Sequence, residues 1–214
     1  MNSVELVWIT PDAEKMIAEI ARVSNPENQH SEKYKGLIKY LIRNDHWSPF
    51  EMACACFKIT TTRAISAQMI RHRSFSFQEF SQRYAEPKFD DIKLSINSFQ
   101  PRLQDNANRQ NSIITSDHKL ISEASGIVED ACEAAYKSYA SLIELGVARE
   151  CARTVLPMMA PTTIYMTGSI RSWIHYINLR SSHGTQREHS QIADNIHEVL
   201  KDHIPVICEL IKEL

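Results

Sequence analysis

Residues 71–84 read RHRSFSFQEFSQRY, a stretch in which Arg71, His72 and Arg73 stand beside closely spaced phenylalanines. An arginine side chain offers a planar fork of donors that suits phosphate groups, so the stretch is typical of an anion site. The aromatic residues indicate partial burial, where unpaired charge would be costly. From these residues alone two alternatives remain open, a solvated charged face and a binding site for single-stranded RNA or DNA.

The composition argues against nucleic acid or a membrane as the partner. Lys plus Arg is 24 and Asp plus Glu is 26, which gives a net charge of −2, whereas a nucleic-acid-binding protein usually leans basic. No segment approaches the roughly 20 apolar residues of a membrane span, and the sequence begins without a signal peptide pattern. No C-x-x-C spacing joins the five cysteines, Cys54, Cys56, Cys132, Cys151 and Cys208. We therefore expect a cytoplasmic protein without a metal site.

Hydrophobic periodicity on both sides of this stretch predicts a mixture of strands and helices. Three segments have the pattern of strands, namely Val4–Ile9, Phe50–Thr62 and Thr162–Thr167. Helical spacing predicts helices that begin at Pro11–Asp12, after Ser31 as an N-cap, at Arg63, at Ser122, at Arg149, after a Gly168–Ser169 turn and at Gln186. The last five of these end at Arg71, at Leu145 before Gly146, at Leu156 before Pro157, near Asn178 and, after a break near Pro205, at Lys212.

The polar segment from Glu86 to Lys119 has no steady period and predicts a long loop with at most short elements. Repeats and a clear interdomain linker are lacking in the sequence, so we predict a single domain over residues 1–214. Its fold class is α+β, with a central, mostly antiparallel sheet flanked by helices.

Further arginines lie in apolar surroundings outside the opening stretch. Arg153 precedes the proline that ends its helix, Arg171 lies inside a predicted helix, and Arg180 stands at the end of that helix. A C-terminal arginine is commonly a cap that complements the helix dipole, so for Arg180 alone a structural role and a ligand contact are equally favoured. On a continuous helix, Gln68 would share a face with Arg71 and His72.

Four segments, in this order, resemble the motifs of the flavin-dependent thymidylate synthases: HWSPFE at 46–51, RHR at 71–73 followed after seven residues by Ser81, RECARTVLP at 149–157, and RSWIHYINLR at 171–180 with QRE at 186–188. The resemblance implies that dUMP is converted to dTMP. The carbon would come from 5,10-methylenetetrahydrofolate and the reducing equivalents from FAD that NADPH has reduced. It further implies a homotetramer whose active sites form where subunits meet.

The resemblance also implies the residues of each site. Arg180 would be catalytic, because a fixed guanidinium favours ionisation at N3 of the pyrimidine. For dUMP the implied set is Gln68, Arg71, Glu79, Phe80, Ser81, Gln82, Arg83, Arg153 and Arg180. For FAD the set is His46, Ser48, Glu51, Arg71, His72, Arg73, Glu79, Ser169, Ile170, Arg171 and His175. The sequence departs from the family's usual residues at Gln82, Ser169, His175 and His189. A non-catalytic nucleotide- or RNA-binding protein is the alternative.

Overall fold

The computed structural model describes residues 2–211, so Lys212, the predicted end of the last helix, lies outside the described residues. The chain divides into two compact units, each described here by itself. Unit 1 comprises Asn2, Thr60–Met69 and Glu79–Ile164, and unit 2 comprises Ser3–Ile59, Ile70–Gln78 and the chain from Tyr165 onward. The extent of a single domain over residues 1–214 stays a prediction.

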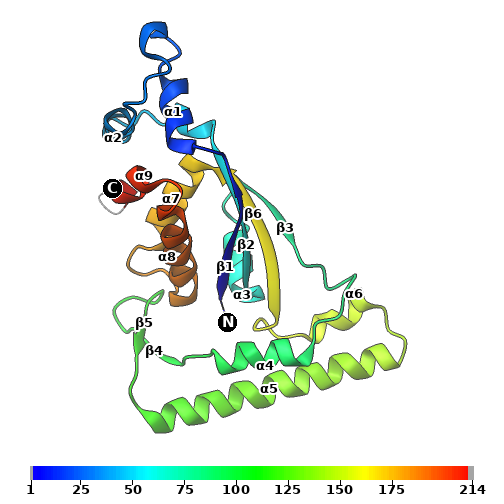
Figure 1. Ribbon diagram of the computed structural model, residues 1–214. Helices are drawn as coiled ribbons and strands as arrows, with labels where there is room; N and C mark the ends of the chain where they lie inside the picture. Colours follow the sequence, from blue (N-terminus) through cyan, green and yellow to red (C-terminus); the bar gives the residue numbers. More distant parts are fainter. Residues whose placement is uncertain (1, 212–214) are drawn as a thin grey trace. The chain divides into compact units, whose positions relative to one another are not determined.

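A four-stranded sheet has the order β1-β2-β6-β3 (Figure 1). Its strands are β1 (Ser3–Ile9), β2 (Cys54–Thr62), β6 (Pro161–Ser169) and β3 (Phe75–Glu79). Backbone hydrogen bonds join the end of one strand to the start of its neighbour: Thr10 N–H to Cys54 O and Arg63 N–H to Ala160 O, both 2.9 Å, and Phe80 N–H to Thr163 O at 2.8 Å. This pattern is antiparallel, as predicted.

The predicted strand at Phe50–Thr62 begins later than expected. Ser48–Glu51 form a 3₁₀ turn, η2, with Pro49 in its first residues, and β2 starts at Cys54. Proline fixes φ and has no N–H, so it favours the start of a helical turn over a strand. The prediction of a turn at Gly168 is wrong, because Gly168 lies inside β6. A Cβ on Gly168 would meet Phe75 Cδ1 at 2.5 Å, which explains the glycine at this position.

In unit 2, three C-terminal helices pack on one another: α7 (Ile170–Arg180), α8 (Arg187–Lys201) and α9 (Pro205–Ile211). Their core is built around Trp173, whose ring lies edge-on to Phe57 and Phe75 and whose Nε1–H donates to Ala55 O at 3.1 Å. Two N-terminal helices, α1 (Ala13–Ala21) and α2 (Lys35–Arg43), follow β1, with the short 3₁₀ helix η1 (Pro26–Asn28) between them. Tyr34, not Ser31, occupies the N-cap position of α2.

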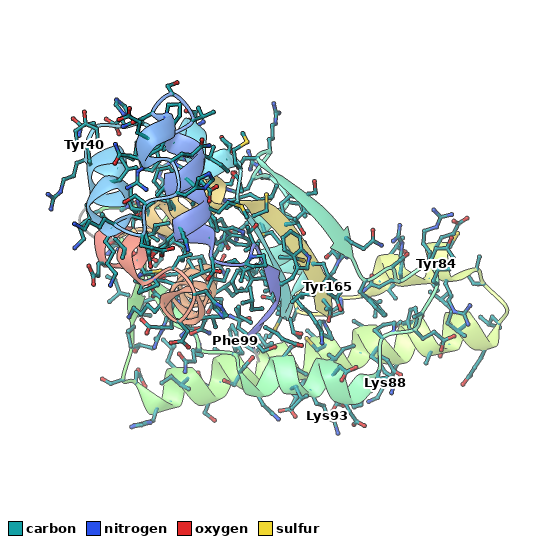
Figure 2. All side chains as sticks on the ribbon, turned by 45° about the horizontal axis from the view of Figure 1, so that its top comes forward. Tyr40, Tyr84, Lys88, Lys93, Phe99 and Tyr165 are labelled. Carbon is teal, nitrogen blue, oxygen red and sulfur yellow. The ribbon has the colours of Figure 1, made fainter. Side chains whose placement is uncertain are left out.

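In unit 1, helix α4 (Phe89–Asn97) lies along the long helix α5 (His118–Glu144), as Figure 1 shows. The prediction of a loop from Glu86 to Lys119 is therefore wrong for α4, which buries Ile92 completely and stacks Phe89 on Tyr136 at 4.9 Å. Strands β4 (Arg102–Gln104) and β5 (Ser112–Ile114) form a short antiparallel hairpin in the same segment. In Figure 2, Tyr84 and Lys88 mark the connection from β3 to α4.

The remaining helices of unit 1 are α3 (Arg63–Met69), α6 (Arg149–Ala152) and the 3₁₀ turn η3 (Arg153–Val155). The predicted Ser122 start of α5 is four residues late, because Asp117 caps the helix by accepting from the N–H groups of Lys119 and Leu120. Gly146, with φ of 81°, ends it as predicted. Since α3 ends at Met69, Arg71 and His72 lie in the following turn and do not continue the helical face of Gln68.

Candidate functional site

Unit 2 contains a pocket of about 610 Å³ beside the N-terminal half of α7, which we call the α7 pocket. It is lined by Asp45, Trp47, Glu51, Ser74, Arg171, Ser172, Ile174, His175 and Asn178. Glu51, Arg171 and His175 belong to the set predicted for FAD, and the fold brings them together from η2 and α7. The other lining residues were not in the predicted FAD set, although all of them except Asp45 and Ser74 lie within the quoted motifs: Asp45, Trp47, Ser74, Ser172, Ile174 and Asn178.

Glu51 joins η2 to the first turn of α7. Its Oε2 accepts from Ser169 Oγ at 2.6 Å, and its Oε1 accepts from Arg171 Nη1 at 2.9 Å. Ser169 also caps α7, as predicted, because its Oγ accepts from the N–H of Ser172 at 3.2 Å. The Ser169 hydrogen bond, helped by Arg171, holds the pKa of the Glu51 carboxyl below its usual value against the opposing effect of burial. The ionised carboxylate thus fixes one wall of the α7 pocket.

The predicted catalytic residue Arg180 ends α7 and contacts the RHR motif. Its Nε–H donates to His72 Nε2 at 2.8 Å. The His72 ring lies edge-on to Tyr176, with centroids 4.9 Å apart, and the Tyr176 hydroxyl is 2.9 Å from Nε2 of the fully buried His189. Burial, together with the charge of Arg180, lowers the pKa of His72 to about 4 and that of His189 to about 3. Both imidazoles are therefore neutral near pH 7.

In unit 1, Glu79 accepts three hydrogen bonds on one oxygen. Ser66 Oγ donates at 2.5 Å, Arg63 Nη1 at 2.9 Å and Thr162 Oγ1 at 3.0 Å, all to Glu79 Oε1. These donors come from α3 and β6, so the carboxylate holds the end of β3 to both elements. Sequence reasoning did not identify Arg63, although it stands at the junction between β2 and α3.

A second pocket, of about 230 Å³, lies within unit 1, and we call it the Gln82 pocket. It is lined by Arg63, Gln82, Arg153, Thr154, Leu156, Pro157 and Met158. Gln82 is only 5% exposed, and among the described residues its Nε2 has no hydrogen-bond partner. Arg153 forms no salt bridge within residues 2–211. A buried donor beside two arginines fits a small anionic group.

Other predicted dUMP residues lie elsewhere in unit 1. Arg83 forms a salt bridge with Glu150 at 2.9 Å, and its N–H donates to Ser81 Oγ at 3.4 Å. Phe80 lines a separate, mainly apolar pocket of about 500 Å³ together with Pro87 and Leu94. Gln68 is half-buried on α3. These residues are thus distributed around the end of β3 and do not all face the Gln82 pocket.

The remaining predicted FAD residues lie outside the α7 pocket. Ile170 is fully buried, and its N–H donates to Ala53 O at 2.8 Å. The ring of His46 contacts Tyr40, with centroids 5.8 Å apart, and Ser48 is exposed at the start of η2. Arg71 and Arg73 are exposed in the turn before β3 and, in the part of the chain that the structure describes, pair with no carboxylate. These two cations are available to an anion.

Two negative findings concern residues 2–211 only. No group of three or more His, Cys, Asp or Glu side chains in this range is arranged to hold a metal ion. No helix in the same range combines the length and apolar character needed to cross a bilayer.

The antiparallel sheet with its helices defines an α+β protein, and arginines line two of its pockets. A family model described as "Thymidylate synthase complementing protein" matches residues 5–206. A probable flavin-dependent thymidylate synthase of Paramecium bursaria Chlorella virus 1 is 47% identical over 198 residues, which cover 92% of this chain and 89% of the relative. The flavin-dependent thymidylate synthase of Synechocystis is 42% identical over 197 residues, 91% of this chain and 87% of the relative.

A solved structure is also similar, namely the UMP/dUMP methylase PolB of Streptomyces cacaoi bound with 5-Br dUMP. It superimposes with a TM-score of 0.83 at 28% sequence identity and covers 100% of this chain and 96% of the solved chain. The chain belongs to the flavin-dependent thymidylate synthase family. The family and the enzymatic activity predicted from the four motifs are thereby confirmed.

Proposed function

We propose that this chain methylates dUMP to dTMP with the residues placed above, using 5,10-methylenetetrahydrofolate as the carbon donor and FAD reduced by NADPH. The observation that carries this assignment is the contact between Arg180 and His72 at 2.8 Å, because a neutral imidazole orients the guanidinium without cancelling its charge. No carboxylate within residues 2–211 pairs with Arg180. Its positive charge remains available to a ligand.

The Gln82 pocket suits the phosphate of the nucleotide. Arg63 and Arg153 supply charged donors, and the side-chain amide of Gln82 supplies a donor that is buried and unsatisfied among the described residues. A buried donor without a partner costs about 1–3 kcal/mol, which an anionic oxygen would recover on binding. The relative solved with 5-Br dUMP supports a nucleoside monophosphate as the ligand.

The α7 pocket suits part of FAD. Its volume of about 610 Å³ falls in the range of small-molecule sites, and Trp47 and His175 offer ring surfaces beside the charged pair of Glu51 and Arg171. When bound, the flavin supplies the reducing equivalents of the reaction. Arg171 would bind a phosphate oxygen, while Glu51 would orient Arg171.

Arg180 would act on the pyrimidine. Carbon C5 becomes nucleophilic when negative charge develops on the ring, and a preorganised guanidinium stabilises that charge. Arg180 has its Nε–H committed to His72, so the terminal nitrogens of its fork remain for the ligand. Within residues 2–211 no general base is hydrogen-bonded to Ser81, which would bind the nucleotide through its hydroxyl.

The assembly and location belong to the same proposal. Arg71 and Arg73 are exposed and pair with no carboxylate of residues 2–211, which favours a homotetramer in which a second subunit completes the site. The five cysteines are free, which favours the reducing cytoplasm.

The test is a turnover assay with the purified full chain. With dUMP, methylenetetrahydrofolate, FAD and NADPH supplied, dTMP should form and the protein should retain yellow flavin. If dTMP fails to form under anaerobic and aerobic conditions alike, the proposed function is wrong. RNA binding by a protein that cannot take up FAD would instead support the non-catalytic alternative.

A further inference from the structure

Arg180 is held at one edge of its guanidinium group. The Nε–H bond to His72 Nε2 fixes the plane of the group, because Nε is part of the conjugated system. The acceptor nitrogen must carry no proton, so the neutral ring of His72 carries its hydrogen on Nδ1. Any rotation of the His72 ring would therefore turn the guanidinium.

The His72 ring is in turn packed against Tyr176. The two rings meet edge to face at an interplanar angle of 71°. Tyr176 precedes Arg180 by four residues on α7, so both side chains lie on the same face of the helix, one turn apart. The Tyr176 side chain is fully buried, and its pKa is raised by burial, so its hydroxyl keeps its proton.

The Tyr176 hydroxyl is fixed from a different helix. His189 lies in the first turn of α8 with no exposed surface, and its Nε2 is 2.9 Å from the hydroxyl. The ring centroids of His189 and His72 are 6.3 Å apart. A polar pair of this kind inside a core is costly to bury unless both members are satisfied, so it specifies one arrangement of the helices.

We propose that Tyr176 and His189 are positioning residues for Arg180, which they aim through the ring of His72. The inference rests on the proposed role of Arg180 in the reaction. Neither residue lines the α7 pocket, so each would act on the rate through the orientation of the Arg180 guanidinium. Neutral aromatic and imidazole groups suit this task because they add no charge that would compete for the cation.

The test compares Tyr176→Phe, which removes only the hydroxyl, with His189→Leu and His189→Gln. Glutamine places its amide near the position of Nε2 and can keep the bond to Tyr176. The assay measures kcat, KM for dUMP and flavin content of the full enzyme. Tyr139→Phe is the matched control, because Tyr139 is 2% exposed and its hydroxyl has no partner in the described part of the chain.

We expect Tyr176→Phe and His189→Leu each to lower kcat about tenfold with unchanged flavin content and KM. A misoriented Arg180 guanidinium slows the reaction without weakening the binding of either ligand. His189→Gln should restore most of kcat, and Tyr139→Phe should leave it unchanged. The decisive measurement is the effect of Tyr176→Phe on kcat in an enzyme that already carries Arg180→Lys. There Tyr176→Phe should change kcat less than twofold, since a residue acting through Arg180 has no further effect once its target is altered.

A failure of the proposed function and a failure of the positioning role of Tyr176 and His189 give different results. If the unaltered enzyme forms no dTMP, both are wrong. If the enzyme is active and Arg180→Lys is slow, but Tyr176→Phe and His189→Leu keep the normal kcat, the inference alone is wrong. It is also overturned if the effect of Tyr176→Phe multiplies fully with that of Arg180→Lys, because independent structural damage behaves in that way.

Discussion

Arg171, which pairs with Glu51, either stabilises the fold or binds FAD, and the two roles predict effects of different size on stability and on FAD affinity when Arg171 is replaced. The side chains of Arg171 and Glu51 are 50% and 38% exposed, and Arg171 Nη1 lies 2.9 Å from Glu51 Oε1. Pairs this exposed contribute about 0–1 kcal/mol to stability, so Arg171→Ala should change the free energy of unfolding by less than about 1 kcal/mol. Ser169 would still donate to Glu51, which keeps the first turn of α7 in place.

The same substitution should weaken FAD binding much more. A hydrogen bond from a charged arginine to a phosphate is worth roughly 1.5–3 kcal/mol, which corresponds to about a ten- to hundredfold rise in the dissociation constant. The assay is titration of the flavin-free protein with FAD, alongside urea unfolding without flavin. Lys39→Ala is the matched control, because Lys39 forms a similar pair with Glu209 at 3.0 Å, with side chains 39% and 63% exposed.

A large loss of stability together with normal FAD binding would contradict the assignment of Arg171 to the flavin site. If Arg171→Ala lost more than about 3 kcal/mol of stability and bound FAD normally, the pair would be a structural anchor of α7 and not part of a flavin site. Equal behaviour of Arg171→Ala and Lys39→Ala in both assays would also count against the assignment.

Three further outcomes are expected. Gln82→Met should leave the free energy of unfolding unchanged or slightly higher, because it removes a buried donor that has no partner among the described residues. It should weaken dUMP binding, measured by calorimetry, about tenfold, and unchanged dUMP affinity would contradict the phosphate assignment. Arg180→Ala should lower kcat far more than it weakens FAD binding, and equal losses would point to a structural role. Stability in urea should fall as the pH drops below 6.5 towards 4, because the unfolded chain protonates His72 and His189 before the folded one does; an unaltered slope in His189→Gln would contradict this.

Local patterns predicted most of the elements, and the errors have physical causes. The aromatic and β-branched residues of Phe50–Thr62 favoured an early start of β2, but Pro49 favours a helical turn before the strand. The segment from Glu86 to Lys119 is polar, so a loop with at most short elements was predicted. Helix α4 needs only one buried face, centred on Ile92, and obtains it from α5. Packing against α5, which is distant in sequence, stabilises the helix that the local pattern of residues 89–97 did not predict.

Contacts between residues distant in sequence also limited the prediction of the candidate site. The motifs predicted Glu51, Arg171 and Arg180 as site residues, because these residue types recur at characteristic spacings, and their roles stay predictions. Tyr176 lies inside the fourth motif and His189 departs from the family's usual residue, but neither was predicted to be a site residue. The spacing of four between Tyr176 and Arg180 was available as a signal, whereas the contact of His189 depends on how α8 packs against α7.

The two arginines of α7 differ in their partners, and the helix itself explains the difference. Arg171 is the second residue of α7, close to the positive end of the helix dipole, where a cation is unfavourable and the carboxylate of Glu51 offsets it. Arg180 is the last residue, at the negative end, where a cation is stabilised without a carboxylate. A neutral imidazole is then sufficient to orient Arg180, and its charge is left for a substrate on which negative charge develops. This difference supports the proposal that the end of α7, rather than its start, takes part in catalysis.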